Sequence, residues 1–202
     1  MPGRLLFVRH AESRLSARGL VNGDPSVDCP LTEEGRRQAR ALRARLARDP
    51  IDVCITTAFR RTQETAEIAL TGVGVPVLLE AGLNDPPLGT FESRPLDEYV
   101  EWLAQHDWAT APPGGGESQL GSVRRFVDAF ARVLELPQDR VLLVTHAFPI
   151  GVARTLAYDP PPAVRPHYEC GFDYVRPVEI APAALAEGVA RARRELSRID
   201  GA

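Results

Sequence analysis

The sequence predicts an α/β fold in which a mostly parallel β-sheet is covered by helices on both faces. Short apolar runs typical of buried strands alternate along the chain with amphipathic segments typical of helices. The chain has 202 residues, of which 44% are hydrophobic and 25% charged, so it can bury a substantial core. No internal repeat and no domain boundary is visible, and we expect a single domain over residues 1–202.

Four apolar runs predict the parallel strands. They are "RLLFV", "DVCIT", "VPVLL" and "RVLLV", at residues 4–8, 52–56, 75–79 and 140–144. Runs of this length, bounded by polar residues, are typical of strands in α/β sheets. After the proline-rich turn "DPPPAVRP" we expect one further strand, at the sheet edge, around residues 172–178.

The first helix is expected over residues 32–49. Thr32 is a good N-cap, and Glu33 and Glu34 suit the positive end of the helix dipole. Its inward stripe would consist of Ala39, Leu42 and Leu46.

Further helices are predicted at residues 60–70, 118–134, 149–157 and 183–199. Two of them have clear apolar faces. These faces are Leu120, Val123, Val127 and Phe130 in one helix, and Leu185, Val189, Ala192, Leu196 and Ile199 in the last.

Residues 82–116 interrupt the alternation of strands and helices. This stretch is rich in proline, contains the run Gly114–Gly116, and holds one amphipathic helix near residues 97–106. A long proline-rich excursion inside a compact domain is usually a lid or a binding loop, and we expect that role here.

Composition limits the partners. The net charge of −3 provides no basic field for nucleic acid, and no apolar run is long enough to span a membrane. The start of the chain leaves no room for a signal peptide before the first strand, so we expect the protein to be cytoplasmic.

The three cysteines, Cys29, Cys54 and Cys170, are scattered along the chain, and this spacing predicts neither disulfides nor a zinc site. The oligomeric state is not predicted.

Two of the four histidines follow predicted strands. Arg9 and His10 follow "LLFV", and His146 follows "VLLVT". If these strands are parallel neighbours, both histidines lie at one edge of the sheet, where open α/β sheets bind ligands. The arginine pair Arg60–Arg61 follows a third strand at the same edge. Together these side chains predict an anion site suited to a phosphoryl group. The other two histidines, His106 and His167, are expected to be solvated.

The chemistry of these residues favours phosphoryl transfer. A neutral imidazole is a good nucleophile near neutral pH, and a backbone carbonyl bound to its other nitrogen would fix the tautomer. Arginine and a second histidine can stabilise the charge on the phosphoryl oxygens. The sequence has no cluster of aspartates, so we expect a reaction without metal or cofactor.

Six segments in order resemble the histidine phosphatase superfamily, also called the phosphoglycerate mutase-like family. "FVRHAES" resembles its R-H-G-E motif, and "CPLTEEGRRQA" its P-L-T-x-x-G-x-x-Q-A segment. "TTAFRRTQETAEI" resembles S-x-L-x-R-A-x-Q-T-A, and "LNDPPLGTFES" resembles L-x-E-x-x-x-G-x-W-E-G. "PGGGES" and "VLLVTHAFPI" resemble P-G-G-E-S and V-x-V-S-H-G-G. The matches cover residues 4 to about 157.

The resemblance implies a three-layer α/β/α fold with a substrate lid, and it implies specific roles. His10 would be the nucleophile that becomes phosphohistidine, and Arg9, Arg61 and His146 would hold the phosphoryl group. The family's proton-donating glutamate falls on Asp85.

The sequence departs from the family pattern at several positions. Ser16 stands where the family often has a phosphate-contacting asparagine, and Ala147 and Phe148 replace glycines. If Asp85 is too short to reach the leaving group, Glu92 or Glu117 would be the proton donor. Residues after Ala157 match poorly.

Three functions remain open at this point. We favour a phosphatase that hydrolyses a small phosphorylated molecule. The excursion is compact and the last helix is an ordinary amphipathic helix, so we expect them to exclude water from the phosphoenzyme less well than a mutase requires. A mutase and a weakly catalytic module that binds phosphorylated ligands are the alternatives. Five aromatic residues are candidates for an apolar pocket beside the phosphate: Phe91, Tyr99, Trp102, Trp108 and Phe148.

Overall fold

The computed structural model describes residues 1–159 and 172–200. In this part of the chain the strands form one sheet in the order β3-β2-β4-β1-β5. Neighbours among the first four strands are parallel, and β5 pairs antiparallel with β1. The strands are β1 (Arg4–Arg9), β2 (Val53–Thr56), β3 (Val77–Leu79), β4 (Arg140–Thr145) and β5 (Val178–Ile180).

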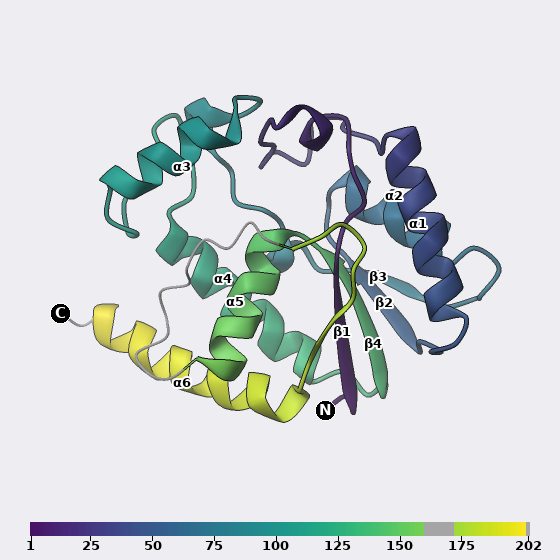
Figure 1. Cartoon of the computed structure of the whole chain (residues 1–202). Coiled ribbons are helices and arrows are strands. Elements are labelled where there is room, and N and C mark those ends of the chain that lie inside the picture. The colour runs from purple at the N-terminus through teal and green to yellow at the C-terminus, as the bar shows by residue number, and fades with distance from the viewer. Residues whose placement is uncertain (160–171, 201–202) are drawn as a thin grey trace.

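Helices cover both faces of this sheet, which confirms the three-layer α/β fold (Figure 1). Helices α1 and α2 pack on one face, and α4, α5 and α6 pack on the other. The helices are α1 (Glu33–Leu46), α2 (Arg60–Ala69), α3 (Leu96–Gln105), α4 (Gln119–Leu134), α5 (Ala147–Tyr158) and α6 (Pro182–Asp200).

Alternating strand residues build the two cores. Leu5 and Phe7 of β1 face α4, α5 and α6, whereas Leu6 and Val8 face α1 and α2. The same alternation holds in β2 and β4. Both faces of the sheet are buried at the central strands β1, β2 and β4, which are therefore apolar at nearly every position and recognisable in the sequence, whereas the edge strand β3 is exposed.

Three details of the predicted elements are wrong. The edge strand forms at residues 178–180 instead of around 172–178, with Val178 and Ile180 alternating around exposed Glu179. The helix expected at 149–157 begins two residues earlier, directly after His146. Ile199 does not belong to the buried stripe of α6, because it is 45% exposed.

The start of α1 is fixed against the loop that follows β1. Thr32 accepts a hydrogen bond from the Gly35 backbone N–H, as an N-cap residue does, and its hydroxyl lies 2.6 Å from the Glu12 carboxylate. A Cβ on Gly35 would stand 2.0 Å from the Glu12 carbonyl oxygen. Only glycine permits this close approach, which ties α1 to the chain beside His10.

The excursion packs against the loop after β1, and Figure 1 shows α3 close to that loop. Backbone hydrogen bonds join Val21 to Arg94 and Ser93, and Leu96 to Gly19. The Glu92 carboxylate accepts from the backbone N–H groups of Gly23 and Leu88. The two segments therefore form one structural unit above the end of the sheet.

The described residues include no helix long and apolar enough to cross a membrane.

Candidate active site

The carboxyl ends of the parallel strands converge on one site. Arg9 pairs with Thr145 in the ladder between β1 and β4, so the next residues, His10 and His146, lie opposite each other. Their ring centroids are 5.4 Å apart. Thr57 follows β2, and Asp85 follows the short turn after β3. The parallel pairing predicted for the two histidine-bearing strands is thus confirmed.

His10 is 4% exposed, and both nitrogens of its ring have hydrogen-bond partners. Its Nδ1 lies 2.7 Å from the Ala11 carbonyl oxygen, which can only accept, so Nδ1 carries the proton. Nε2 therefore keeps its lone pair, which accepts a hydrogen bond of 3.2 Å from Nε of Arg61. This is the tautomer that a nucleophilic histidine needs.

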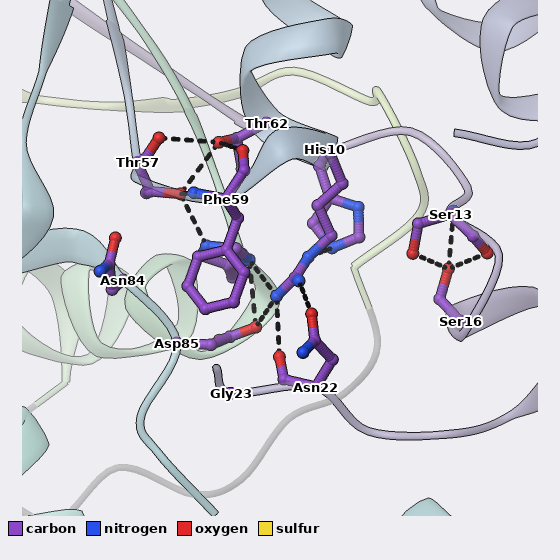
Figure 2. A network of polar contacts seen from close by, with 12 residues as sticks. His10, Ser13, Ser16, Asn22, Gly23, Thr57, Phe59, Thr62, Asn84 and Asp85 are labelled. Atoms are coloured by element: carbon purple, nitrogen blue, oxygen red, sulfur yellow. Dashed lines mark hydrogen bonds and ion pairs between the residues drawn. The ribbon is translucent and has the colours of Figure 1, made fainter. Parts of the chain in front are cut away.

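Arg61 links the groups of the site. Besides its bond to His10, its Nη1 donates to the Asn22 side-chain oxygen over 2.6 Å, and its Nη2 donates to the Asn22 carbonyl over 3.1 Å. Nη2 also donates to Oδ2 of Asp85 over 2.9 Å. Arg61 is 4% exposed, whereas its neighbour Arg60 is exposed and pairs with Asp28. Figure 2 shows Asn22 and Asp85 joined through this network beside His10.

His146 is held at both ring nitrogens. Nδ1 lies 3.0 Å from Oδ2 of Asp85, and Nε2 lies 3.0 Å from the hydroxyl of Thr57. The Thr57 hydroxyl in turn contacts the hydroxyl of Thr62, as Figure 2 shows. Nδ1 also lies 3.1 Å from Nη2 of Arg61, whose hydrogens are used by Asn22 and Asp85. Because the carboxylate of Asp85 can only accept, we assign the proton of His146 to Nδ1 and make the Thr57 hydroxyl the donor to Nε2. His146 therefore presents an N–H donor to the site.

Burial and charge set the protonation of the site. Burial and the nearby charge of Arg61 lower the pKa of His10 well below its usual range. Burial lowers the pKa of His146 to about 4, although Asp85 opposes the shift. Burial alone raises the pKa of Asp85, but His146 and Arg61 outweigh it and lower that pKa well below its ordinary value. At neutral pH both imidazoles are neutral and Asp85 is ionised.

Arg9 supplies a second guanidinium at the site. Its Nη1 donates to the Phe172 carbonyl over 2.8 Å, and its guanidinium carbon lies 4.2 Å above the ring of Tyr174. Its Nε is buried and has no hydrogen-bond partner among the described residues. Tyr174 lies beyond residue 157, where the sequence motifs that we recognised end, so sequence reasoning missed it.

In the loop after β1, the predicted residue Ser16 makes no contact with Arg61, whereas Asn22, which was not predicted, does. Ser16 lies on the cavity wall, but its hydroxyl bonds to Ser13 and not to the histidines or Arg61 (Figure 2). Asn22 is 8% exposed and binds Arg61 through both its side chain and its carbonyl. The sequence signal for Asn22 was weak, because an Asn-Gly pair usually marks a turn.

The two alternative proton donors serve the loops instead. Glu92 binds the backbone N–H groups of Gly23 and Leu88. Glu117 forms an ion pair with Arg125, whose guanidinium also donates to the carbonyl oxygens of Gly82 and Asn84. Both carboxylates thus help to hold the loop that carries Asp85, and Asp85 is the carboxylate on the cavity wall.

A cavity of about 150 Å³ opens beside His10. Of the aromatic residues expected to line it, only Phe148 does. Tyr99 and Trp102 stack inside the excursion with Phe91 tilted against both, and Trp108 packs against the main core. These four candidates do not line the cavity: the aromatic side chains of α3 pack with Phe91 inside the excursion, and Trp108 packs on the main core.

Of the other sequence predictions, His106 is exposed as expected, whereas His167 and Cys170 lie outside the described residues. Cys29 and Cys54 are buried free thiols. In residues 1–159 and 172–200 no three His, Cys, Asp or Glu side chains are grouped as a metal site requires.

The model of the histidine phosphatase superfamily (branch 1) matches residues 5–176. The chain belongs to the histidine phosphatase superfamily.

Relatives in this superfamily carry both mutase and phosphatase names. A probable phosphoglycerate mutase GpmB from Cronobacter sakazakii is 35% identical over 157 residues, which are 73% of this chain and 71% of the relative. A protein of the same name from Yersinia enterocolitica is 33% identical over 80% of this chain and 78% of its own length.

Two solved structures show the same fold. A putative α-ribazole-5'-P phosphatase from Escherichia coli superposes with a TM-score of 0.69 at 26% identity, over 81% of this chain and 84% of its own. YhfR from Bacillus stearothermophilus superposes with a TM-score of 0.68 at 25% identity, over 85% and 87% of the two chains. Membership in the histidine phosphatase superfamily thus does not distinguish a mutase from a phosphatase.

Proposed function

We propose that this histidine phosphatase-like protein hydrolyses the phosphate monoester of a small molecule through a phosphohistidine on His10. One observation carries the proposal. The Ala11 carbonyl holds the proton of His10 on Nδ1, so the Nε2 lone pair faces a buried site that contains Arg61 and His146. A nucleophile without a proton, beside donors for an anion, is the arrangement that phosphoryl transfer requires.

In the first step Nε2 of His10 attacks phosphorus, and the bond from phosphorus to the alcohol oxygen breaks. The guanidinium groups of Arg9 and Arg61 and the Nδ1–H of His146 donate to the phosphoryl oxygens, on which negative charge is concentrated. Arg61 is already fixed by Asn22, so little reorganisation is needed when the phosphoryl group enters.

Asp85 supplies the proton to the leaving alcohol in this proposal. At rest the carboxylate is ionised, because Arg61 and His146 lower its pKa. A phosphoryl dianion bound at Arg61 brings negative charge close to Asp85 and draws the N–H donors away from it, and both changes raise the pKa of the carboxyl. The proton arrives with the substrate monoanion or from solvent, and Asp85 donates it as the ester bond breaks.

The second step returns the enzyme to its starting state. Water attacks phosphorus of the phosphohistidine, the bond from nitrogen to phosphorus breaks, and Asp85 accepts the proton that water loses. His10 recovers its lone pair and inorganic phosphate leaves. Once phosphate has left, Arg61 and His146 again lower the pKa of Asp85, which releases this proton to solvent and returns to its ionised resting state.

A mutase is the second candidate, because the relatives named above are called probable phosphoglycerate mutases. A mutase must retain a substrate that carries a further anionic group beside the phosphoryl group. The described residues that line the cavity include two permanent cations, Arg9 and Arg61, and both lie at the phosphoryl end. This supports the phosphatase. Incubation with a phosphoglycerate distinguishes the two by the release of phosphate or the formation of its isomer.

The nucleophile is tested by trapping the intermediate. His10→Ala should abolish turnover of 4-nitrophenyl phosphate, and a quench that avoids acid should find phosphate on His10 of the wild type. His146→Ala should lower the rate on the order of a hundredfold through the loss of one donor. His106→Ala is the matched control, because this histidine is exposed on the excursion, and it should leave the rate unchanged.

Phosphate trapped on any residue other than His10 would overturn the mechanism. Tight binding of phosphate without turnover would support the module that only binds phosphorylated ligands.

The role of Asp85 is tested with leaving groups of different basicity. Asp85→Asn should slow hydrolysis of alkyl phosphates severely and spare 4-nitrophenyl phosphate, whose leaving group needs little protonation. Equal losses on both substrates would make Asp85 a structural residue only.

The remaining expectations rest on the sequence. We propose that catalysis needs no metal and that the substrate is a small phosphorylated molecule, without a nucleic-acid or membrane partner, in the cytoplasm. Hydrolysis of an aryl phosphate should survive a chelator, with competitive inhibition by vanadate. Loss of activity in EDTA and its recovery with Mg²⁺ would contradict the metal-free reaction.

A further inference from the structure

The cavity beside His10 has two chemically different ends. Its polar end consists of His10, Arg9, Arg61 and Asp85. Away from these groups the described wall is mainly aliphatic and aromatic. The apolar lining residues that matter here are Leu15, Leu20, Val21, Leu88, Leu96 and Phe148.

The apolar end is built into the fold. Leu20 and Val21 belong to the loop after β1, and Leu96 begins α3 in the excursion. The backbone bonds from Val21 to Arg94 and from Leu96 to Gly19 fix these two segments against each other. Leu88 packs in the same cluster as the aromatic residues of the excursion. The wall is therefore held in place before any ligand arrives.

The amide and hydroxyl side chains of Asn22, Ser13 and Ser16 near this wall are already engaged, and Tyr174 packs against Arg9 at the phosphoryl end. Asn22 uses its side-chain oxygen for Arg61 and its amide nitrogen for the Asp24 carbonyl. Ser13 and Ser16 bond to each other. Among the described lining residues, the only permanent cations are Arg9 and Arg61, which lie at the phosphoryl end. A second anionic group on the substrate would lose water in the apolar part without meeting a cation among the described lining residues, which is unfavourable.

We propose that the substrate is the phosphate monoester of an apolar alcohol, with no negative charge besides the phosphoryl group. This inference rests on the phosphatase proposed above and adds the class of its substrate. The phosphoryl group lies between the two guanidinium groups and His10. The alcohol part lies against Leu20, Leu96 and Phe148, where burial of its apolar surface contributes to binding.

A matched pair of esters tests this proposal. Benzyl phosphate and 4-carboxybenzyl phosphate have the same reacting bond and differ by one carboxylate far from phosphorus. The wild type should hydrolyse benzyl phosphate with a kcat/KM higher by about tenfold or more, since a desolvated unpaired charge costs several kcal/mol when fully buried and less at a partly open wall.

A pair of variants on one helix adds a direct control. Leu96→Arg places a cation on the apolar wall and should shift the preference toward the carboxylated ester. Val100→Arg adds the same charge one turn along α3 at an exposed position outside the cavity, and it should keep the wild-type preference. A shift of the same size in both variants would contradict the assigned wall.

The outcomes separate the two proposals. Equal or faster hydrolysis of the carboxylated ester by the wild type, with phosphate trapped on His10, overturns the substrate class and leaves the phosphatase standing. Hydrolysis of neither ester, together with no trapped phosphate on His10, overturns the phosphatase and with it the substrate class. If the wild type prefers benzyl phosphate, and Leu96→Arg reduces this preference while Val100→Arg does not, the result supports the phosphatase and its substrate class.

Discussion

Replacing His146 by glutamine should remove much of the sensitivity of the folded protein to mild acid. His146 is 1% exposed, and burial lowers its pKa to about 4 in the folded state. In the unfolded chain its pKa is the ordinary value of about 6.5. The unfolded state therefore binds more protons between these two values, and the free energy of unfolding falls as the pH falls from about 7 toward 4.

The size of the effect follows from these two pKa values. At pH 7 the histidine is neutral in both states and contributes almost nothing to the pH dependence. At pH 5 the unfolded chain is almost fully protonated at this position and the folded chain hardly at all, so the expected loss is about 2 kcal/mol. The lowered pKa of His10 adds to the loss in wild type and variant alike. Asp85 has its lowered pKa outside this range.

Urea unfolding at pH 7 and pH 5 measures this difference. The wild type should lose about 2 kcal/mol more than His146→Gln between the two pH values. His106→Gln changes an exposed histidine and should behave like the wild type. An equal loss in wild type and His146→Gln would refute the reasoning, because His146 would then titrate alike in the folded and unfolded states.

Three further substitutions test the packing and the site. Gly35→Ala places a Cβ 2.0 Å from the Glu12 carbonyl oxygen and should lower the free energy of unfolding by about 2 kcal/mol, whereas an unchanged melting temperature would show that the loop moves away easily. Phe130→Ala empties a fully buried position and should cost about 3–5 kcal/mol in urea unfolding, and a loss below about 1 kcal/mol would mean that the core collapses around it. Thr57→Val removes the donor to Nε2 of His146, so it should lower kcat about tenfold and shift the pH profile of the reaction. Thr57→Ser retains a hydroxyl and should keep the wild-type kcat and pH profile. Equal behaviour of the two variants would contradict a role for the hydroxyl.

The central fold was predictable from the sequence because its central strands are buried on both faces. Runs such as Leu5–Val8 have no solvent-facing position, so they stand out from the polar loops around them. The edge strand was misplaced because only Val178 and Ile180 of its three residues face inward. A strand this short gives a weak alternation signal, and its position depends on pairing with β1.

The site was predictable where the strands determine it. His10 and His146 follow paired strands, so their proximity follows from the topology. Asn22 and Tyr174 come from loops whose paths depend on tertiary contacts, and no spacing in the sequence places them beside Arg61 or Arg9. The walls of the cavity were misassigned for the same reason. The side chains that line it depend on how the excursion packs on the loop after β1.

The position of Arg61 also has a consequence for which ions the site admits. Two imidazoles and a carboxylate are residue types that zinc and other first-row transition metals favour, but among the described residues they are not grouped as a metal site requires. Here the guanidinium donates to Nε2 of His10 over 3.2 Å and to the Asp85 carboxylate over 2.9 Å. A metal ion at this place would have to displace a buried guanidinium that Asn22 also holds, and it would meet that fixed positive charge. The same guanidinium that attracts a phosphoryl anion therefore places a fixed positive charge beside the histidine pair, and this charge disfavours a metal cation there.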